Sequence, residues 1–194
     1  MSEYVIQGQT LTGIADSIRG QLGTTQQYTP ESMASAIGSI QGGLESIVSG
    51  KITGDIAIDA TDIKAYGISF IYNPMRVYLP KCTNLSASNA IYSNSALYCA
   101  CFDAVQSFGI LSMGSNTSLN AVIVRSNSIP SVQTSTFNNT PIASGTGYIY
   151  VPDDLVAQYQ VATNWVTYAE QIKGMSEIPA DIQEWLDQQG GTTV

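Results

Sequence analysis

The stretch MRVYLPKCTNL, residues 75–85, has the pattern of a short strand that ends at a proline. Alternation with a period of two places Val77 and Leu79 on one face of this strand and Tyr78 on the other. Pro80 has no amide hydrogen to donate to a sheet, so the strand is predicted to end there. The chain after the proline is then expected to return beneath the strand.

Cys82 and Leu85 are the apolar residues of this return, and the turn that they complete cannot be stable alone. Such a turn buries about four apolar side chains, each worth roughly 1.5–3 kcal/mol. Ordering about 22 residues costs about 1–2 kcal/mol apiece in backbone entropy. Stability therefore requires neighbouring turns that share a core and pair their strand edges.

Similar segments recur along the chain. Predicted strand starts near residues 56, 77, 97, 121 and 148 are spaced at 20–27 residues. A period of this size lies in the range of leucine-rich-repeat solenoids. The recurring segments are GDIAIDATDI (54–63), SALYCAC (95–101), NAVIVRSNSI (120–129) and GYIYVP (147–152).

Two segments resemble the BspA-type leucine-rich-repeat family: VYLPKCTNL (77–85) and FNNTPIASGTGYIYVPDDLVAQYQVATNWVTYAEQIKGMSEI (137–178). The second segment is similar to that family's terminal repeat and its helical end. The resemblance covers residues 50–178 and implies an α+β fold. In this fold, short strands stack into a short BspA-like solenoid over residues 46–152, and residues 153–194 form a C-terminal helical cap with an acidic tail.

Residues 1–45 are predicted to form a separate helical hairpin that serves attachment and oligomerisation. Residues 4–40 resemble a helical module near the start of tail and appendage proteins of phages and prophages of Gram-positive bacteria. Helices of about ten residues are marginal alone, so their apolar stripes must meet each other, the rest of the chain, or another subunit. The stripe residues are Leu11, Ile14, Ile18, Leu22, Met33, Ile37 and Ile40.

The C-terminal residues show three further apolar stripes at helical spacing. Solenoids need a cap because the terminal turn exposes an apolar end, and the first two stripes suit that role. The third stripe is expected either to pack onto the cap or to dock a partner protein. The stripes are Leu155, Tyr159 and Ala162, then Trp165, Tyr168 and Ile172, then Ile182, Trp185 and Leu186.

Charge and composition exclude several classes of function. The net charge is −8, which disfavours binding to a nucleic-acid backbone. No run of 18 apolar residues is present, so no membrane insertion is expected. The first residues, MSEYVIQGQT, lack the basic and apolar regions of a secretory signal. Three cysteines do not make a disulfide framework, and they are interpreted as small buried apolar residues.

Catalytic motifs are missing from the sequence. The chain contains 0 histidines, which excludes nucleophile systems that depend on a histidine base and makes a zinc site improbable. The carboxylates Asp55, Asp59 and Asp62, and the pair Asp153 and Asp154, are interpreted as turn and cap residues. No phosphate-binding glycine motif is present. We therefore expect no catalytic residues, no metal site and no cofactor, and an enzyme acting on glycans ranks third among the functions considered.

The high tyrosine content points to a binding surface more clearly than any other feature of the sequence: the chain has 11 tyrosines and 4 phenylalanines. Tyrosines that point outward from successive strands would form a row suited to stacking and hydrogen bonding with a ligand. Subunit contact, or cover by the flanking loops, is the alternative. The residues predicted to face inward are Val77, Leu79, Leu97, Cys99, Ile149 and Val151. Alternation along each strand then places four tyrosines outward as candidate ligand-binding residues: Tyr78, Tyr98, Tyr148 and Tyr150.

Together, the resemblances imply a non-enzymatic phage virion appendage protein, such as a tail or head fibre. Such a protein recognises the host surface or attaches an adhesin, so its expected partners are other virion structural proteins and a host cell-surface glycan or protein. The same resemblances imply a homo-oligomer, with a trimer expected. The alternative is a bacterial BspA-like adhesin located at the bacterial cell surface rather than in the virion.

Overall fold

The structure, a computed structural model, describes residues 54–69 and 74–189, all of which belong to the unit Ile52–Val194. The predicted helical hairpin of residues 1–45, including every anchor residue from Leu11 to Ile40, lies outside the described residues. The fold described below is therefore that of the second unit.

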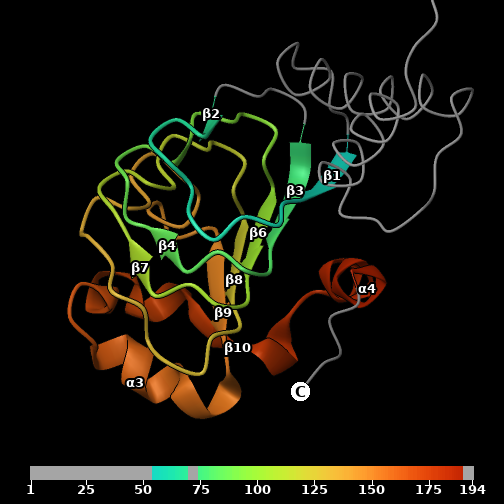
Figure 1. Cartoon of the computed structure of the whole chain (residues 1–194). Coiled ribbons are helices and arrows are strands. Elements are labelled where there is room, and N and C mark those ends of the chain that lie inside the picture. The colour runs from blue at the N-terminus through green and yellow to red at the C-terminus, as the bar shows by residue number, and fades with distance from the viewer. Residues whose placement is uncertain (1–53, 70–73, 190–194) are drawn as a thin grey trace, which may run out of the picture. The chain divides into compact units, whose positions relative to one another are not determined.

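The described chain has an α+β fold built on a parallel sheet of short strands (Figure 1). The six-stranded sheet has the order β1-β3-β6-β8-β9-β10, and each neighbouring pair is parallel. Its strands are β1 (Gly54–Ala57), β3 (Pro74–Leu79), β6 (Cys99–Phe102), β8 (Ala121–Val124), β9 (Tyr148–Val151) and β10 (Ile172–Gly174).

The register of this sheet repeats along the sequence. Each strand pairs with the strand of the next segment at an offset of 20 to 27 residues, the same range as the spacing predicted for the strand starts. One column of paired residues shows the pattern: Ile56 with Val77, Val77 with Ala100, Ala100 with Val122, Val122 with Ile149, and Ile149 with Ile172.

Two small parallel sheets lie on one side of the main sheet (Figure 1). One pairs β2 (Ile68–Ser69) with β5 (Ile91–Tyr92), and the other pairs β4 (Asn84–Leu85) with β7 (Ser107–Phe108). Parallel strands need a long connection, and here irregular turns that carry the small sheets supply it.

The inner core fills the space between the main sheet and these connections. Val77, Leu79, Cys82 and Leu85 are all buried in it, which confirms the strand and return predicted from residues 75–85. Toward the C-terminus the inner core becomes aromatic. Phe102, Phe108, Phe137, Tyr159, Trp165 and Tyr168 form a chain of ring contacts with centroids 5.0–6.1 Å apart.

Two asparagines form a buried amide chain between successive segments. Asn116 Oδ1 accepts hydrogen bonds from the backbone N–H of Asn94 at 2.8 Å and from Asn94 Nδ2 at 3.2 Å. Asn94 Nδ2 also donates to the carbonyl of Ile68, and Asn116 Nδ2 donates to the carbonyl of Ile91. Both asparagines are fully buried, so these bonds satisfy backbone groups that water cannot reach.

The C-terminal part begins with η1 (Asp153–Leu155), α3 (Val156–Val161) and η2 (Trp165–Gln171), which connect β9 to β10. Tyr159, Trp165 and Tyr168 are buried in the inner core, as their helical spacing predicted. Ile172 is buried there too, but its placement on a helix was wrong, because Ile172 pairs with Ile149 as the first residue of a strand. The strand β10 was not predicted: it extends the sheet beyond β9. The chain then continues through η3 (Met175–Glu177) to α4 (Ala180–Gln188), which lies on the other side of the sheet from β4 and β7 (Figure 1).

Candidate recognition surfaces

The outer face is the side of the six-stranded sheet opposite the inner core. Pairing aligns Tyr78 with Cys101, Cys101 with Ile123, and Ile123 with Tyr150. Three residues of α4 pack against this face: Ile182, Trp185 and Leu186. The same apolar cluster holds the buried outer-face residues Tyr78, Cys99, Cys101, Ala121, Ile123 and Tyr150, and the partly buried Tyr98, Tyr148, Met175 and Ile178 pack against it.

The four tyrosines predicted to bind a ligand do not form an exposed row. Tyr78 is 7% exposed and Tyr150 is 4% exposed, while Tyr98 and Tyr148 are half-buried beside them. The predicted outward direction is confirmed, because all four tyrosines lie in or against the outer-face cluster, but the predicted accessibility is wrong for Tyr78 and Tyr150. Tyr78 and Tyr150 lie on the predicted face of the sheet, and helix α4 of the same chain packs against that face.

One inward residue was also predicted wrongly. Cys99 lies on the outer face, because β6 begins at Cys99 and places Ala100 and Phe102 in the inner core. The residue that pairs with Tyr78 is consequently Cys101 rather than Tyr98. The other predicted inward residues, Val77, Leu79, Leu97, Ile149 and Val151, are all buried in the inner core.

Tyr78 takes part in a polar network at the end of the outer face. Its hydroxyl donates to Asp103 Oδ2 at 2.5 Å, and Arg125 Nη1 lies 3.5 Å from Asp103 Oδ1. Burial, followed by the hydrogen bond to Asp103 and the charge of Asp103, raises the pKa of Tyr78 to about 12. Tyr78 is therefore a neutral hydrogen-bond donor at physiological pH.

Tyr150 lies in a cluster with Tyr148 and Lys173 at the other side of the outer face. The Tyr148 and Tyr150 rings are 6.4 Å apart, and Lys173 Nζ lies 4.5 Å from the centroid of the Tyr148 ring. This is a cation–π geometry. Burial, together with the neighbouring Tyr98, raises the pKa of Tyr150 to about 12.

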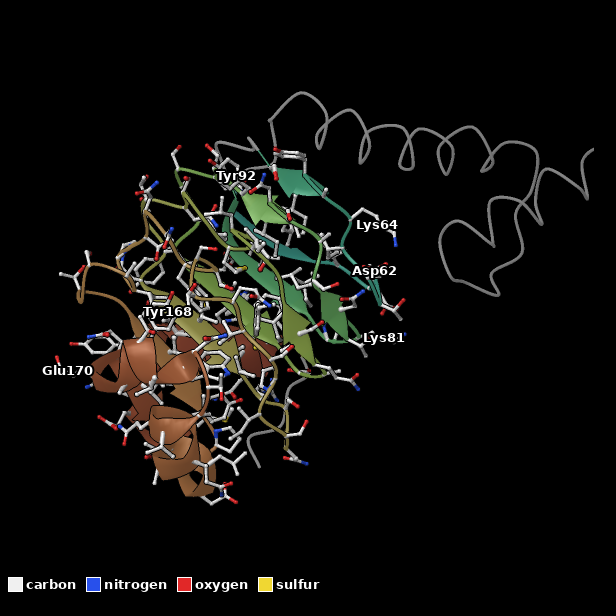
Figure 2. All side chains as sticks on the ribbon, turned by 90° about the vertical axis from the view of Figure 1, so that its left-hand side faces the viewer. Asp62, Lys64, Lys81, Tyr92, Tyr168 and Glu170 are labelled. Carbon is white, nitrogen blue, oxygen red and sulfur yellow. The ribbon has the colours of Figure 1, made fainter. Side chains whose placement is uncertain are left out.

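A second tyrosine cluster, on the connecting turns, was not predicted. Tyr66 is 54% exposed and its ring meets that of Tyr92 edge to face at 6.2 Å. Asn89 Nδ2 donates to the Tyr66 hydroxyl at 2.7 Å. We call Tyr66, Asn89 and Tyr92 the turn cluster, and Figure 2 labels Tyr92 on the side of the molecule that carries these turns.

The turn cluster includes strained backbone. Tyr66, Asn89 and Leu111 occupy successive turns and have φ of 58°, 58° and 53°, in the left-handed region. The Tyr66 amide donates to the Asn89 carbonyl, and the Asn89 amide donates to the Ile110 carbonyl, so the turns stack directly. Asparagine tolerates this conformation, but a bulky residue such as Tyr66 is held there at a cost of about 1–3 kcal/mol.

Charged groups with possible chemistry are engaged in ion pairs and caps. Asp55 pairs with Arg76 at 3.0 Å, Asp59 pairs with Lys81 at 2.7 Å, and Asp62 pairs with Lys64. Asp62, Lys64 and Lys81 lie along one margin in Figure 2, away from Tyr168 and Glu170 of η2. Asp153 accepts a hydrogen bond from Ser176 Oγ at 2.6 Å.

Among residues 54–69 and 74–189, no three His, Cys, Asp or Glu side chains are grouped so that they could hold a metal ion. Within the same ranges, no helix combines the length and the apolar character needed to cross a membrane. The three cysteines are all free thiols and buried, which confirms their interpretation as small apolar residues.

Compared with known proteins, the sequence matches no family model, and no curated protein matches it significantly.

Proposed function

We propose that this protein is a non-enzymatic virion appendage protein, of tail-fibre or head-fibre type, that recognises a host surface or attaches an adhesin. In this proposal the stacked segments form a short solenoid of the BspA-like leucine-rich-repeat type. The pairing of equivalent strands at offsets of 20–27 residues is the observation that carries the proposal. Such stacks present rigid, extended surfaces that suit recognition.

The turn cluster is the surface that this proposal assigns to the ligand. An exposed tyrosine ring supplies stacking area at low entropic cost. The hydrogen bond from Asn89 Nδ2 to the Tyr66 hydroxyl and the edge-to-face contact with Tyr92 hold the Tyr66 ring in place. This chemistry fits a cell-surface glycan or a polar protein surface.

In this proposal the two parts of the chain have the separate roles expected from the sequence. Residues 1–45 attach the chain to other virion structural proteins and assemble it as a homotrimer, which the two apolar stripes of short helices support. The stacked segments then face the host. Analytical ultracentrifugation of the full chain tests the oligomer, and a monomer at micromolar concentration contradicts it.

Binding of the full-length protein to Gram-positive cells and to arrayed surface glycans tests the ligand assignment. We expect Tyr66→Ser combined with Tyr92→Ser to weaken binding by about tenfold or more, as at an aromatic hot spot. Val161→Ser is the matched control, because Val161 is 78% exposed on α3 and outside the turn cluster. A folded double variant that binds as tightly as the wild type contradicts the assignment.

Antibodies against the chain distinguish the virion from the bacterial surface. We expect immunoelectron microscopy to label the tail or head of phage particles. Labelling of bacterial envelopes in the absence of particles supports a BspA-like surface adhesin instead and contradicts the virion assignment.

A further inference from the structure

Helix α4 is attached to the outer face by few interactions. Its apolar side chains Ile182, Trp185 and Leu186 pack onto the sheet. Arg76 Nη1 donates to the carbonyl of Asp181 at 3.1 Å, and the Arg76 guanidinium lies 5.4 Å from the Trp185 ring. Within residues 54–69 and 74–189, the helix therefore contacts the sheet through these three apolar side chains and Arg76.

The N-terminal end and the central residue of α4 are incompletely satisfied. The helix is 9 residues long and begins after Pro179, which makes no side-chain capping hydrogen bond. Helices shorter than about 12–15 residues are marginal in water, so α4 depends on its contact with the sheet. Trp185 Nε1 is buried without a hydrogen-bond partner among the described residues, which makes that contact less favourable.

The outer face does not need α4 to keep its shape. Its strands are paired with one another on the sheet, and the inner core packs against their other side. The Tyr78 hydroxyl is bonded to Asp103, so this tyrosine is satisfied by a residue outside α4. Removing α4 would leave a pre-formed face of Tyr78, Cys99, Cys101 and Tyr150 rather than a disrupted sheet.

We propose that α4 is a displaceable cover of the outer face. The helix opens while the sheet and the inner core stay folded, and opening uncovers the apolar, tyrosine-bearing surface beneath it. This is a local opening of the kind that small, sparsely packed elements undergo. It does not depend on the virion function proposed above.

The three cysteines are built-in reporters of this opening. Cys99 and Cys101 lie under α4 on the outer face, whereas Cys82 lies in the inner core. Burial raises the pKa of the Cys99 and Cys101 thiols, which keeps them unreactive while α4 is in place. Opening of α4 exposes this pair alone, whereas unfolding of the whole unit exposes Cys82 as well.

Pulsed labelling of the full-length protein with N-ethylmaleimide, read by mass spectrometry for each cysteine, tests the proposal. Under native conditions we expect Cys99 and Cys101 to be labelled while Cys82 stays protected. Trp185→Ala should speed labelling of the outer-face pair by about tenfold or more and leave Cys82 unchanged, because it removes the central contact of α4. Glu184→Gln, on the exposed side of α4, is the matched control and should label like the wild type.

Equal labelling rates for all three cysteines, in the wild type or in Trp185→Ala, overturn the proposal, since they mean that the outer face opens only when the unit unfolds. An unchanged rate at Cys99 and Cys101 in Trp185→Ala overturns it as well.

Discussion

The two tryptophans of this chain occupy opposite sides of one sheet and are held very differently. Trp165 lies in the inner core, where its ring contacts Phe108 and Tyr159 and its Nε1 donates to the carbonyl of Pro130 at 2.7 Å. Trp185 lies over the outer face, edge to face with Tyr78 at 6.5 Å, and its Nε1 has no partner among the described residues. The indole N–H of Trp165 therefore has a hydrogen-bond partner, whereas that of Trp185 has none among the described residues.

Chain connectivity explains this difference. The segment that carries Trp165 joins β9 to β10, so both of its ends are tied into the sheet by backbone pairing. The helix that carries Trp185 follows β10, and no strand comes after it among the described residues. A segment held between two paired strands opens only with them, whereas a helix that is not held between strands can open without breaking strand pairing.

The largest effect is expected on the inner side. Leu79→Ala should lower the free energy of unfolding by about 2–5 kcal/mol, because Leu79 is fully buried and the smaller side chain leaves a cavity. Urea denaturation measures the change. Ile110→Ala is the control: Ile110 is 53% exposed, and its replacement should change stability by less than about 0.5 kcal/mol. A loss of only a few tenths in Leu79→Ala would contradict the register of β3.

The two tryptophans provide a direct comparison of the two sides. Trp165→Phe leaves the buried Pro130 carbonyl without its donor, so we expect it to cost about 1–3 kcal/mol more than Trp185→Phe, in which no hydrogen bond is lost. Urea denaturation of both variants, followed by circular dichroism, measures the difference. Equal destabilisation of the two variants would contradict a net contribution of the Trp165–Pro130 hydrogen bond to stability.

The smallest effect concerns alkaline pH and the outer face. The pKa of Tyr78 and the pKa of Tyr150 are each raised from 10.0 to about 12 in the folded protein. A raised pKa means that the folded state holds the phenolic proton more tightly than the unfolded chain. The resulting stability is present below about pH 10 and is lost as the pH rises toward about 12.

We therefore expect the Tm of the wild type to fall between about pH 10 and 12, and to fall less in Tyr78→Phe combined with Tyr150→Phe. Differential scanning calorimetry across this range measures both slopes. Equal slopes of Tm against pH in the two proteins would contradict the raised pKa values of Tyr78 and Tyr150.

The sequence was sufficient to predict the inner side of the sheet, because period-two alternation holds within each strand. It failed at Cys99, where the alternation was extended backward from the strand to Leu97. Leu97 and Ala100 both face the inner core, so three positions rather than two separate them, and Tyr98 lies outside the strand. A residue just before a strand does not obey the period of the strand.

Long-range packing explains the other misses. The third stripe, Ile182, Trp185 and Leu186, correctly indicated a helix with a buried side, but helical spacing does not say which surface covers it. Strand β10 is only three residues long, IKG, and pairing with β9 makes it a strand. The turn cluster depends on the left-handed backbone of Tyr66, which no residue preference signals.

The buried amide chain of Asn94 and Asn116 restricts how the length of this protein can change. The two asparagines are 22 positions apart, and each bonds the backbone of the preceding segment. Deleting one residue between them would shift an amide away from its carbonyl and leave a buried polar group unsatisfied. Duplicating residues 95–116 as a block would instead insert a new asparagine at the matching position. Genes for such chains are therefore expected to lengthen or shorten by whole segments, and the same rule offers a designer a way to extend the sheet one strand at a time.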